Sequence, residues 1–251
     1  MEKFFLTEKV CAENRISFIH TESTVSTSGD ARELFYSGDT SSCLIVSDRQ
    51  SGGRGRRGKC FLSPLGGLYF TLSLPAELPI SQVLGVTSSS AVCVMRAIRK
   101  SCGAFCGIKW VNDVYLREKK LAGILVESIN DYEKMLSRRV MIGIGVNVAS
   151  VPDVDCAVSL AKCGFDVSRD LLLSEITREL IHLSENGFDF SLYADEYRKN
   201  SVVLGRDVTY TENGVMKNAV AVGIDDAGGL IVEEGGIRRT LSSGEITLRT
   251  R

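Results

Sequence analysis

The chain has 251 residues, with 30 lysines and arginines against 31 aspartates and glutamates, so its formal net charge is −1 at pH 7. This balance argues against a surface built to bind nucleic acid, and no apolar run approaches the roughly 20 residues that cross a bilayer. The length allows one large domain and a smaller one, and eight cysteines without an export signal predict reduced thiols in a cytoplasmic protein.

The first part of the chain is expected to alternate between strands and helices. An apolar run at residues 16–19 predicts a strand, and the hydroxyl residues Ser23 and Thr24 follow it. These hydroxyls can cap the helix expected through residues 31–35, or they can hold a small polar ligand where the strand ends. Residues 43–47 are typical of a buried strand, which leads directly into an unusual segment.

That segment, residues 49–59, is called the glycine–arginine loop below. It carries five positive charges and four glycines but no acidic residue. Unpaired charges are costly to bury and glycine disfavours a helix, so we expect a mobile surface loop with free backbone N–H groups. Such a loop is suited to binding anions.

Several functions are compatible with this loop. Residues 53–59 match G-x-x-x-x-G-K, but Cys60 stands where a phosphate-binding loop has the hydroxyl for Mg²⁺, and no helix start follows. A nucleic-acid patch would need further basic clusters, which the sequence lacks. Two interpretations remain: a solvated loop without a ligand, and a loop that folds over a carboxylate and a triphosphate.

Three further elements are predicted from apolar periodicity. Residues 67–74 alternate as a strand, and residues 81–102 repeat with helical spacing and form a structural helix. Residues 140–148 predict another strand, which contains two glycines. Glycines within a strand indicate that a ligand or another chain approaches the backbone.

Residues 109–116 and 119–127 are predicted as two strands of a hairpin with a charged turn. Asn112 and Asp113 are poor strand formers in the middle of the first run. A strand that breaks the rules of its own pattern often marks a functional site. These two residues are therefore candidates for binding.

The last part of the chain changes in composition. Helices are expected at residues 168–184 and 192–199. From residue 205 onward, five short strands alternate with turns rich in Gly, Asp and Asn, which predicts a small barrel. The expected fold class is therefore α/β of the α+β type, a mixed sheet with packed helices followed by a small β-barrel.

Four motifs together resemble the biotin–protein ligases. They are GRGRRG at residues 53–58, KWVND at 109–113 beside the family's usual KWPND, KKLAGILVE at 119–127 and GIGVN at 143–147. The resemblance extends from about Ser23 to the end, and it implies a catalytic domain at residues 1–203 and an SH3-like domain at 204–251. Val111 departs from the family because it replaces proline and removes a restraint on φ.

The resemblance implies an ATP-dependent ligase. The carboxylate of biotin would attack the α-phosphate of ATP, releasing pyrophosphate, and biotinyl-5′-AMP would then give its biotinyl group to a lysine of a biotin carboxyl carrier protein. Two anions must meet, so the chemistry demands neutralisation and alignment more than a nucleophilic side chain. A cationic loop meets that demand and, once ordered, shields the mixed anhydride from water.

The family's functional residues fall on matching positions of this sequence. The implied biotin-binding residues are Ser23, Thr24, Gln50, Arg54, Arg56, Lys120 and Gly123. Of these, the residues implied in catalysis are Arg54, Arg56 and Lys120. The implied ATP-binding residues are Arg56, Arg57, Lys109, Asn112 and Asn147, and Asp113 is the implied Mg²⁺ ligand. Trp110 is expected to pack beneath the site.

The resemblance also has implications for the binding partners of the protein and for alternative functions. It implies a carrier-protein acceptor and leaves a homodimer open. Some relatives carry an N-terminal helix-turn-helix domain, but 22 residues before Ser23 are too few for one, so we expect no sequence-specific DNA binding. A lipoate ligase or octanoyl transferase of similar fold is the main alternative. An RNA-binding module would instead bind single strands in a salt-sensitive way without ATP turnover.

Overall fold

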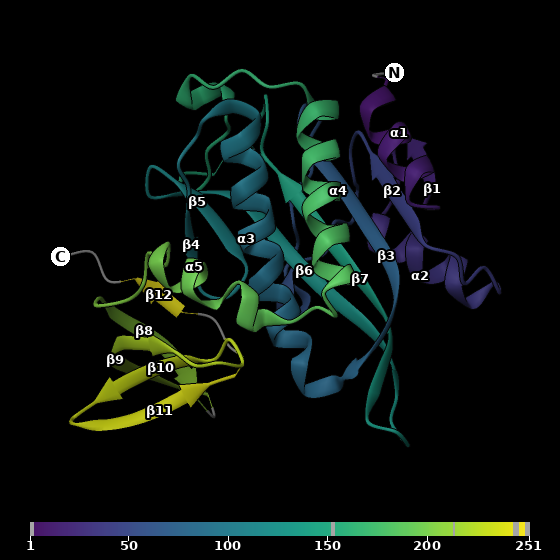
Figure 1. The fold of residues 1–251 in the computed structure, drawn as a ribbon. Coiled ribbons are helices and arrows are strands. Elements are labelled where there is room, and N and C mark those ends of the chain that lie inside the picture. The colour runs from purple at the N-terminus through teal and green to yellow at the C-terminus, as the bar shows by residue number, and fades with distance from the viewer. Residues whose placement is uncertain (1–2, 152–153, 213, 243–245, 249–251) are drawn as a thin grey trace.

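The fold consists of two β-sheets, and helices pack on the larger one (Figure 1). The computed structural model describes the chain apart from residues 1–2, 152–153, 213, 243–245 and 249–251. Within the described residues, the first sheet has seven strands in the order β1-β2-β3-β7-β6-β5-β4, and the second has five in the order β11-β10-β9-β8-β12. β1 and β2 are parallel and the other neighbours of the first sheet are antiparallel, so the predicted mixed sheet is confirmed.

The elements have the following bounds. The first sheet comprises β1 (Ser17–Thr21), β2 (Cys43–Ser47), β3 (Leu68–Pro79), β4 (Gly107–Lys109), β5 (Asp113–Leu116), β6 (Lys119–Asp131) and β7 (Leu136–Val146). The helices are α1 (Phe5–Glu13), α2 (Thr27–Tyr36), α3 (Val83–Cys102), α4 (Arg169–Glu185) and α5 (Ala194–Lys199). The second sheet comprises β8 (Asp207–Glu212), β9 (Val215–Ile224), β10 (Leu230–Glu234), β11 (Ile237–Leu241) and β12 (Ile246–Leu248). In the described part of the chain, each helix is too short or too polar to cross a membrane.

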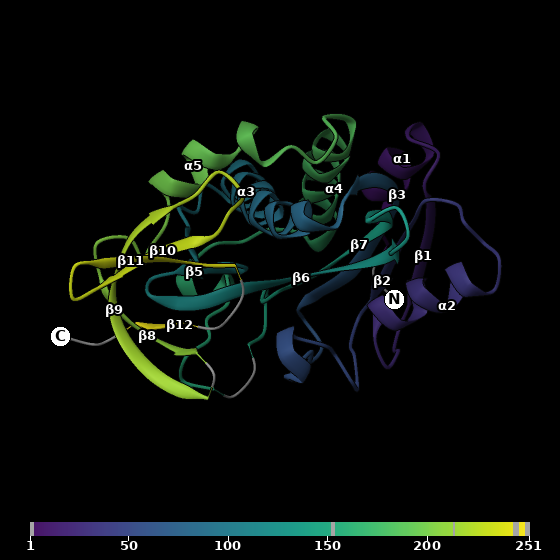
Figure 2. The same ribbon diagram turned by 90° about the horizontal axis from the view of Figure 1, so that it is seen from below.

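Side chains of β2 show how the two faces of the first sheet are covered. Successive residues of a strand point to opposite faces. Leu44 and Val46 belong to the main core, which also contains the buried side chains of α3 and α4. Cys43 and Ile45 belong to a smaller cluster on the other face, together with Ala31 of α2. Figure 2 shows α3 and α4 side by side above the strands. The face that carries α2 is thus less covered by helices, and it is open to a ligand.

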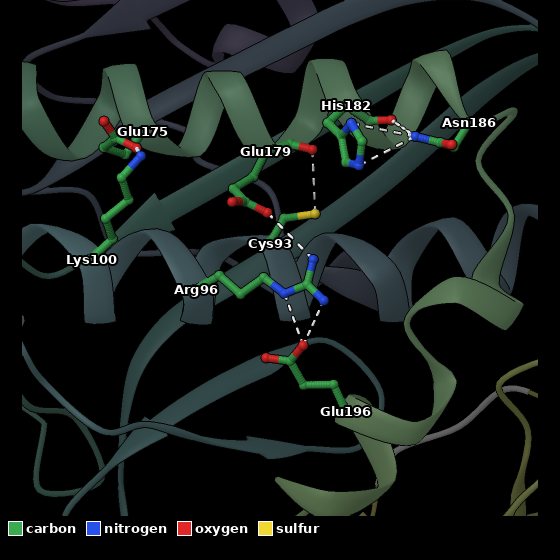
Figure 3. Close-up of polar contacts among 8 residues, drawn as sticks. All are labelled: Cys93, Arg96, Lys100, Glu175, Glu179, His182, Asn186 and Glu196. Atoms are coloured by element: carbon green, nitrogen blue, oxygen red, sulfur yellow. Dashed lines mark hydrogen bonds and ion pairs between the residues drawn. The ribbon is translucent and has the colours of Figure 1, made fainter.

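Charged contacts join α3 to α4 and α5 (Figure 3). Arg96 Nη2 lies 2.6 Å from Glu196 Oε2, and Arg96 Nη1 lies 3.6 Å from Glu179 Oε2. Lys100 Nζ lies 2.5 Å from Glu175 Oε2. Because these groups are partly exposed, each pair contributes at most about 1 kcal/mol, and the apolar core carries most of the packing energy.

Helix α1 forms where no helix is predicted. Thr7, Val10 and Cys11 are buried on one side of it. Its first N–H groups are capped from a distance, because the carboxylate of Asp170 in α4 accepts hydrogen bonds from the N–H groups of Leu6 at 2.8 Å and Thr7 at 2.9 Å. The capping group lies 163 residues away from Thr7, so no local capping signal marks this helix.

Residues 109–116, predicted as one strand, instead form the end of β4, a turn and β5. Asn112 explains the interruption. Its backbone C=O accepts from the N–H of Ile124 at 2.9 Å, and its side-chain Nδ2 donates to the C=O of Ile124 at 2.8 Å. One residue thus satisfies both backbone groups of its neighbour in β6, and β5 begins only after it. The peptide between Trp110 and Val111 within the turn is cis.

The second sheet contains the five short strands predicted from the C-terminal composition. Its strand order begins at β11 and ends at β12. Among the residues that the structure describes, these two end strands do not pair, so the expected closed barrel is not formed there. Buried side chains of the five-stranded sheet, such as Val208 and Ala221, belong to the same apolar core as those of the first sheet.

One hydrogen bond links the two sheets through a motif residue. The indole N–H of Trp110 donates to the C=O of Gly228 at 2.9 Å, and Trp110 is 3% exposed. Trp110→Phe leaves that buried C=O without its donor, which should destabilise the protein by about 1–2 kcal/mol. We expect the melting temperature in scanning calorimetry to fall by about 2–8 °C. Phe105→Leu, at an exposed position, is the control, and equal melting temperatures for both variants would contradict this role.

Candidate functional site

A cavity of about 310 Å³ lies beside β6 and β7, on the face of the sheet that carries α2. Five separate parts of the chain meet in it: the start of α2, the glycine–arginine loop, the turn before β5, the strand pair β6 and β7, and β12 of the second sheet. The lining includes Thr27, Ser28, Gln50, Arg54, Arg56, Phe61, Lys109, Asn112, Asp113, Lys120, Gly123, Gly143 and Thr247. A site that combines so many segments can be disrupted by changes in either sheet.

Glycines of β6 and β7 lie at the floor of the cavity, where Gly123 and Gly143 are among the lining residues. Gly123 of β6 and Gly145 of β7 are paired across the two strands, and the ring of Phe61 lies on both. A Cβ atom at Gly145 would lie 2.2 Å from Phe61 Cε1, and one at Gly123 would lie 2.9 Å from Phe61 Cε2. Any side chain at these positions would push the ring away. The structure shows Phe61 of the same chain close to the backbone of Gly145, and the approach of a ligand or another chain stays a prediction.

Hydroxyl and amide groups form one wall. The N–H of Thr27 donates to Gln50 Oε1 at 2.9 Å, and Gln50 Nε2 donates to Ser63 Oγ at 2.9 Å. The hydroxyls of Thr27 and Ser28 lie 2.9 Å and 3.1 Å from the hydroxyl of Thr71. Hydroxyls can both donate and accept, so this wall can adapt to a polar ligand with mixed groups.

Ser23 and Thr24, the expected binding residues of this wall, are not brought to the cavity. Ser23 is exposed, and the hydroxyl of Thr24 donates to Asp30 Oδ1 at 2.9 Å. The sequence contains a second Ser-Thr pair three residues later. Ser26 of that pair caps α2 by accepting from the N–H of Gly29 at 3.4 Å, and Thr27 lines the cavity. The signal that distinguishes the two pairs is that only the second precedes the helix directly.

Cationic groups from three motifs converge on the opposite side. Lys120 Nζ lies 2.7 Å from Asp113 Oδ1, which holds the ammonium group at the cavity. Arg56 Nη1 donates to Asn112 Oδ1 at 3.3 Å and thereby links the glycine–arginine loop to the turn before β5. Arg54 also lines the cavity. These charges would favour a ligand that carries several negative charges.

A tyrosine supports Lys109, another lining residue. Lys109 Nζ donates to the hydroxyl of Tyr115 at 3.4 Å. Burial, and secondarily the nearby carboxylate of Asp113, raises the pKa of Tyr115 to about 12. The phenol therefore stays neutral at physiological pH and adds no negative charge beside the lysine.

The structure separates the other predicted residues from the cavity. Arg57 lies in the same loop but lines a neighbouring cavity. Asn147 is 4% exposed, and its Nδ2 donates to the C=O of Val158 at 3.1 Å, so it fixes the segment after β7. Neither residue is among those that line the cavity, whereas Gln50, Arg54, Arg56, Lys109, Asn112, Asp113, Lys120 and Gly123 are.

The donor set of the cavity is suited to bringing anions together. Among the residues that the structure describes, no cluster of three or more His, Cys, Asp or Glu side chains forms a metal site. Asp113 is the one carboxylate in the described lining, and it is paired with Lys120. The arrangement supplies cations and hydrogen-bond donors where negative charge would gather, as expected for reactions of phosphates and carboxylates.

Comparisons with known proteins agree with this chemistry. Residues 19–147 match the model of the biotin/lipoate A/B protein ligase family, and residues 203–249 match the biotin protein ligase C-terminal domain. The chain is similar to the bifunctional ligase/repressor BirA of Bacillus subtilis, with 30% identity over 87% of this chain and 70% of that protein. It is 29% identical to the biotin–[acetyl-CoA-carboxylase] ligase of Paracoccus denitrificans, over 89% of this chain and 97% of that one.

A structural comparison extends the likeness to both sheets. The biotin protein ligase from Aquifex aeolicus in complex with biotin and ATP has a TM-score of 0.74 and 27% identity, over 94% of this chain and 99% of that chain. The chain spans 66% of the length of the BirA protein of Escherichia coli, to which it is 29% identical over 82% of its own length.

Proposed function

Since the chain belongs to the biotin/lipoate A/B protein ligase family, we propose that it activates biotin with ATP and transfers the biotinyl group to a lysine of a biotin carboxyl carrier protein. The relatives named as biotin ligases support this choice over the lipoate branch. The observation that carries the proposal is the single cavity in which Arg54, Arg56 and Lys120 meet a polar wall and a glycine floor.

The cavity suggests where each part of the substrates binds. The ring system of biotin would lie beside the ring of Phe61, with its polar end at the wall of Thr27, Ser28 and Gln50. Its carboxylate would point to Lys120. The phosphates of ATP would then bind at Arg56, Lys109 and Asn112, and Arg54 would serve the carboxylate and the phosphates together.

The reaction needs two bond exchanges. A carboxylate oxygen of biotin forms a bond to the α-phosphorus as the bond to pyrophosphate breaks, which gives biotinyl-5′-AMP. The amine of the acceptor lysine then attacks the carbonyl carbon, and AMP leaves with the electron pair of the broken C–O bond while the amine loses a proton. Lys120 and Arg56 would stabilise the charge that develops on the phosphate oxygens in the first step.

Mg²⁺ is the ion that ATP chemistry implies. The described residues offer it one carboxylate, Asp113, with the amide oxygen of Asn112 nearby in sequence and cavity. Mg²⁺ is commonly held by one or two carboxylates together with substrate phosphates and water, so this donor set fits the ion. When bound, Mg²⁺ would neutralise phosphate charge. Asp113 would hold it from the protein side and would also orient Lys120.

The direct test is mass spectrometry after the protein is mixed with ATP, Mg²⁺ and either biotin or lipoate. We expect biotinyl-5′-AMP, and biotinylation of an added carrier domain at one lysine. Lipoyl adenylate alone would place the protein in the lipoate branch. The absence of any adenylate, with salt-sensitive binding of single-stranded RNA, would favour the binding module instead.

Thiol labelling gives a second, independent prediction. Cys60 and Cys156 are exposed and Cys60 lines the cavity, whereas burial raises the pKa of Cys11 and Cys106 to about 12. Iodoacetamide at pH 8 should therefore modify Cys60 and Cys156 first, because the thiolate is the reactive form. Biotin and ATP together should slow the modification of Cys60, as measured by peptide mapping, and leave Cys156 unchanged as the internal control. Equal protection of both would contradict the proposed binding place.

A further inference from the structure

A second cavity, of about 490 Å³, lies between the glycine–arginine loop and β6. Residues 52–60 form most of its lining, and β6 contributes Leu125 and Glu127. Among the described residues of this lining, Glu127 is the only acidic one. It shares the cavity with four cations of the loop: Arg54, Arg56, Arg57 and Lys59. The carboxylate of Glu127 therefore lies in the positive field of the glycine–arginine loop.

Glu127 belongs to the same face of β6 as the substrate cavity. Gly123, Leu125 and Glu127 are two residues apart, so they share one face of the strand, and the first two line the substrate cavity. Glu127 Oε1 accepts from Arg32 Nη2 of α2 at 2.7 Å. Its second oxygen, Oε2, is buried and has no hydrogen-bond partner among the described residues. An unpaired buried carboxylate oxygen is costly, so it is a ready acceptor for a further donor.

Arg57 differs from the other loop cations of this second cavity because it does not line the substrate cavity. Arg54, Arg56 and Lys59 line both cavities, but Arg57 lines only the second. It is exposed and has no charged partner among the described residues. Its φ of 55° is left-handed, in a turn that also contains Gly58 at φ 73°. The backbone of Arg57 is thus left-handed, and its side chain lines the same cavity as Glu127.

We propose that Glu127 is a positioning residue for the glycine–arginine loop. When the loop closes over biotinyl-5′-AMP, the guanidinium of Arg57 binds Glu127 Oε2, while Arg32 keeps Oε1 and orients the carboxylate. Arg54 and Arg56 remain available to the substrate. The inference rests on the proposed function, since the ligand beneath the closed loop is the adenylate, but it adds a contact that holds the loop shut from outside the substrate cavity.

The test measures how long the enzyme retains its adenylate. Biotinyl-5′-AMP is formed on the protein, excess substrate is removed by rapid gel filtration, and release is followed by mass spectrometry. We expect Glu127→Gln and Arg57→Gln each to release the adenylate about 10-fold faster, because each removes one charge of the same contact. The double variant should release it no faster than either single variant. Arg49→Gln is the matched control for Arg57→Gln, because it removes a charge from the same loop outside both cavities, and its release should stay within about twofold of the parent.

The outcomes separate this contact from a structural role and from the proposed function itself. Additive effects in the double variant, equal effects of Arg49→Gln and Arg57→Gln, or unchanged release in Arg57→Gln would each overturn the inference. Arg57 is exposed, so that variant is expected to fold even if Glu127→Gln does not, and the melting temperature of every variant checks this. If the parent protein and Arg49→Gln form no biotinyl-5′-AMP, the proposed function fails and not the contact alone.

Discussion

Replacing Lys120 by glutamine should slow the formation of biotinyl-5′-AMP by about 10²–10³-fold. Lys120 Nζ is held at the cavity by Asp113 Oδ1 at 2.7 Å, and the lysine also lies beside the ring of Phe61, with Nζ 5.7 Å from its centre. In the proposed function, this ammonium group faces the place where the carboxylate and the α-phosphate meet. Glutamine keeps hydrogen-bonding capacity but loses the charge, so it removes stabilisation that grows as the phosphate gains charge.

The measurement is single-turnover adenylate formation at saturating biotin and ATP, so that weaker binding does not hide the chemical step. Lys119→Gln is the matched control, because Lys119 is the adjacent residue of the same motif but is exposed and does not line the cavity. That control should keep the parent rate. If Lys120→Gln reacts within about threefold of the parent rate, Lys120 is not the residue at the reacting groups.

Arg56→Gln should have two effects, with adenylate formation about 10²-fold slower and the adenylate released faster. Arg56 lines the substrate cavity, and its Nη1 donates to Asn112 Oδ1 at 3.3 Å. It therefore both supplies charge to the site and ties the loop to the turn before β5. Glutamine is chosen because it preserves the backbone preferences of the loop better than glycine would.

The two effects are measured separately, the first by single-turnover kinetics and the second by the gel-filtration assay described above. Arg49→Gln, at an exposed position outside the substrate cavity, is the control. Faster release with an unchanged rate of formation would reduce Arg56 to a role in loop closure. An unchanged rate in both assays would show that the loop closes without it.

Most of the cationic side of the site can be predicted from short linear motifs. Three short motifs identify four cationic residues by their positions within each motif. The structure brings all four to one cavity: Arg54, Arg56, Lys109 and Lys120. The strand predictions succeed for a similar reason. Residues 43–47 and the C-terminal strands have simple periods that local sequence determines.

The polar wall could not be predicted in the same way. Ser23 with Thr24 and Ser26 with Thr27 are chemically alike, and their difference lies in where β1 stops and α2 begins. Boundaries of elements are set by tertiary contacts as much as by local sequence, such as the hydrogen bond from the Thr27 N–H to Gln50 Oε1. A shift of three residues therefore moved the predicted binding group out of the cavity.

Contacts between segments that are far apart in the chain also could not be predicted from the sequence. Phe61 contacts a glycine in each of two strands. Gly123 lies more than sixty positions further along the chain, and Gly145 lies more than eighty positions further along. The unpaired Oε2 of Glu127 can be identified only once its neighbours in space are known, because in the sequence Glu127 is simply the last residue of the predicted strand 119–127. Such features depend on which strands become neighbours, which a single sequence does not state.

The hydrogen bond from Trp110 to Gly228, together with the place of Thr247 in the cavity lining, limits how this protein can be engineered. Replacing the last fifty residues by those of a distant homologue would change part of the cavity lining and also the acceptor of the Trp110 hydrogen bond. Chimeras should thus recover turnover only when both sides of that junction come from one parent. The residues that contact each other across the two sheets are therefore expected to change together among related proteins.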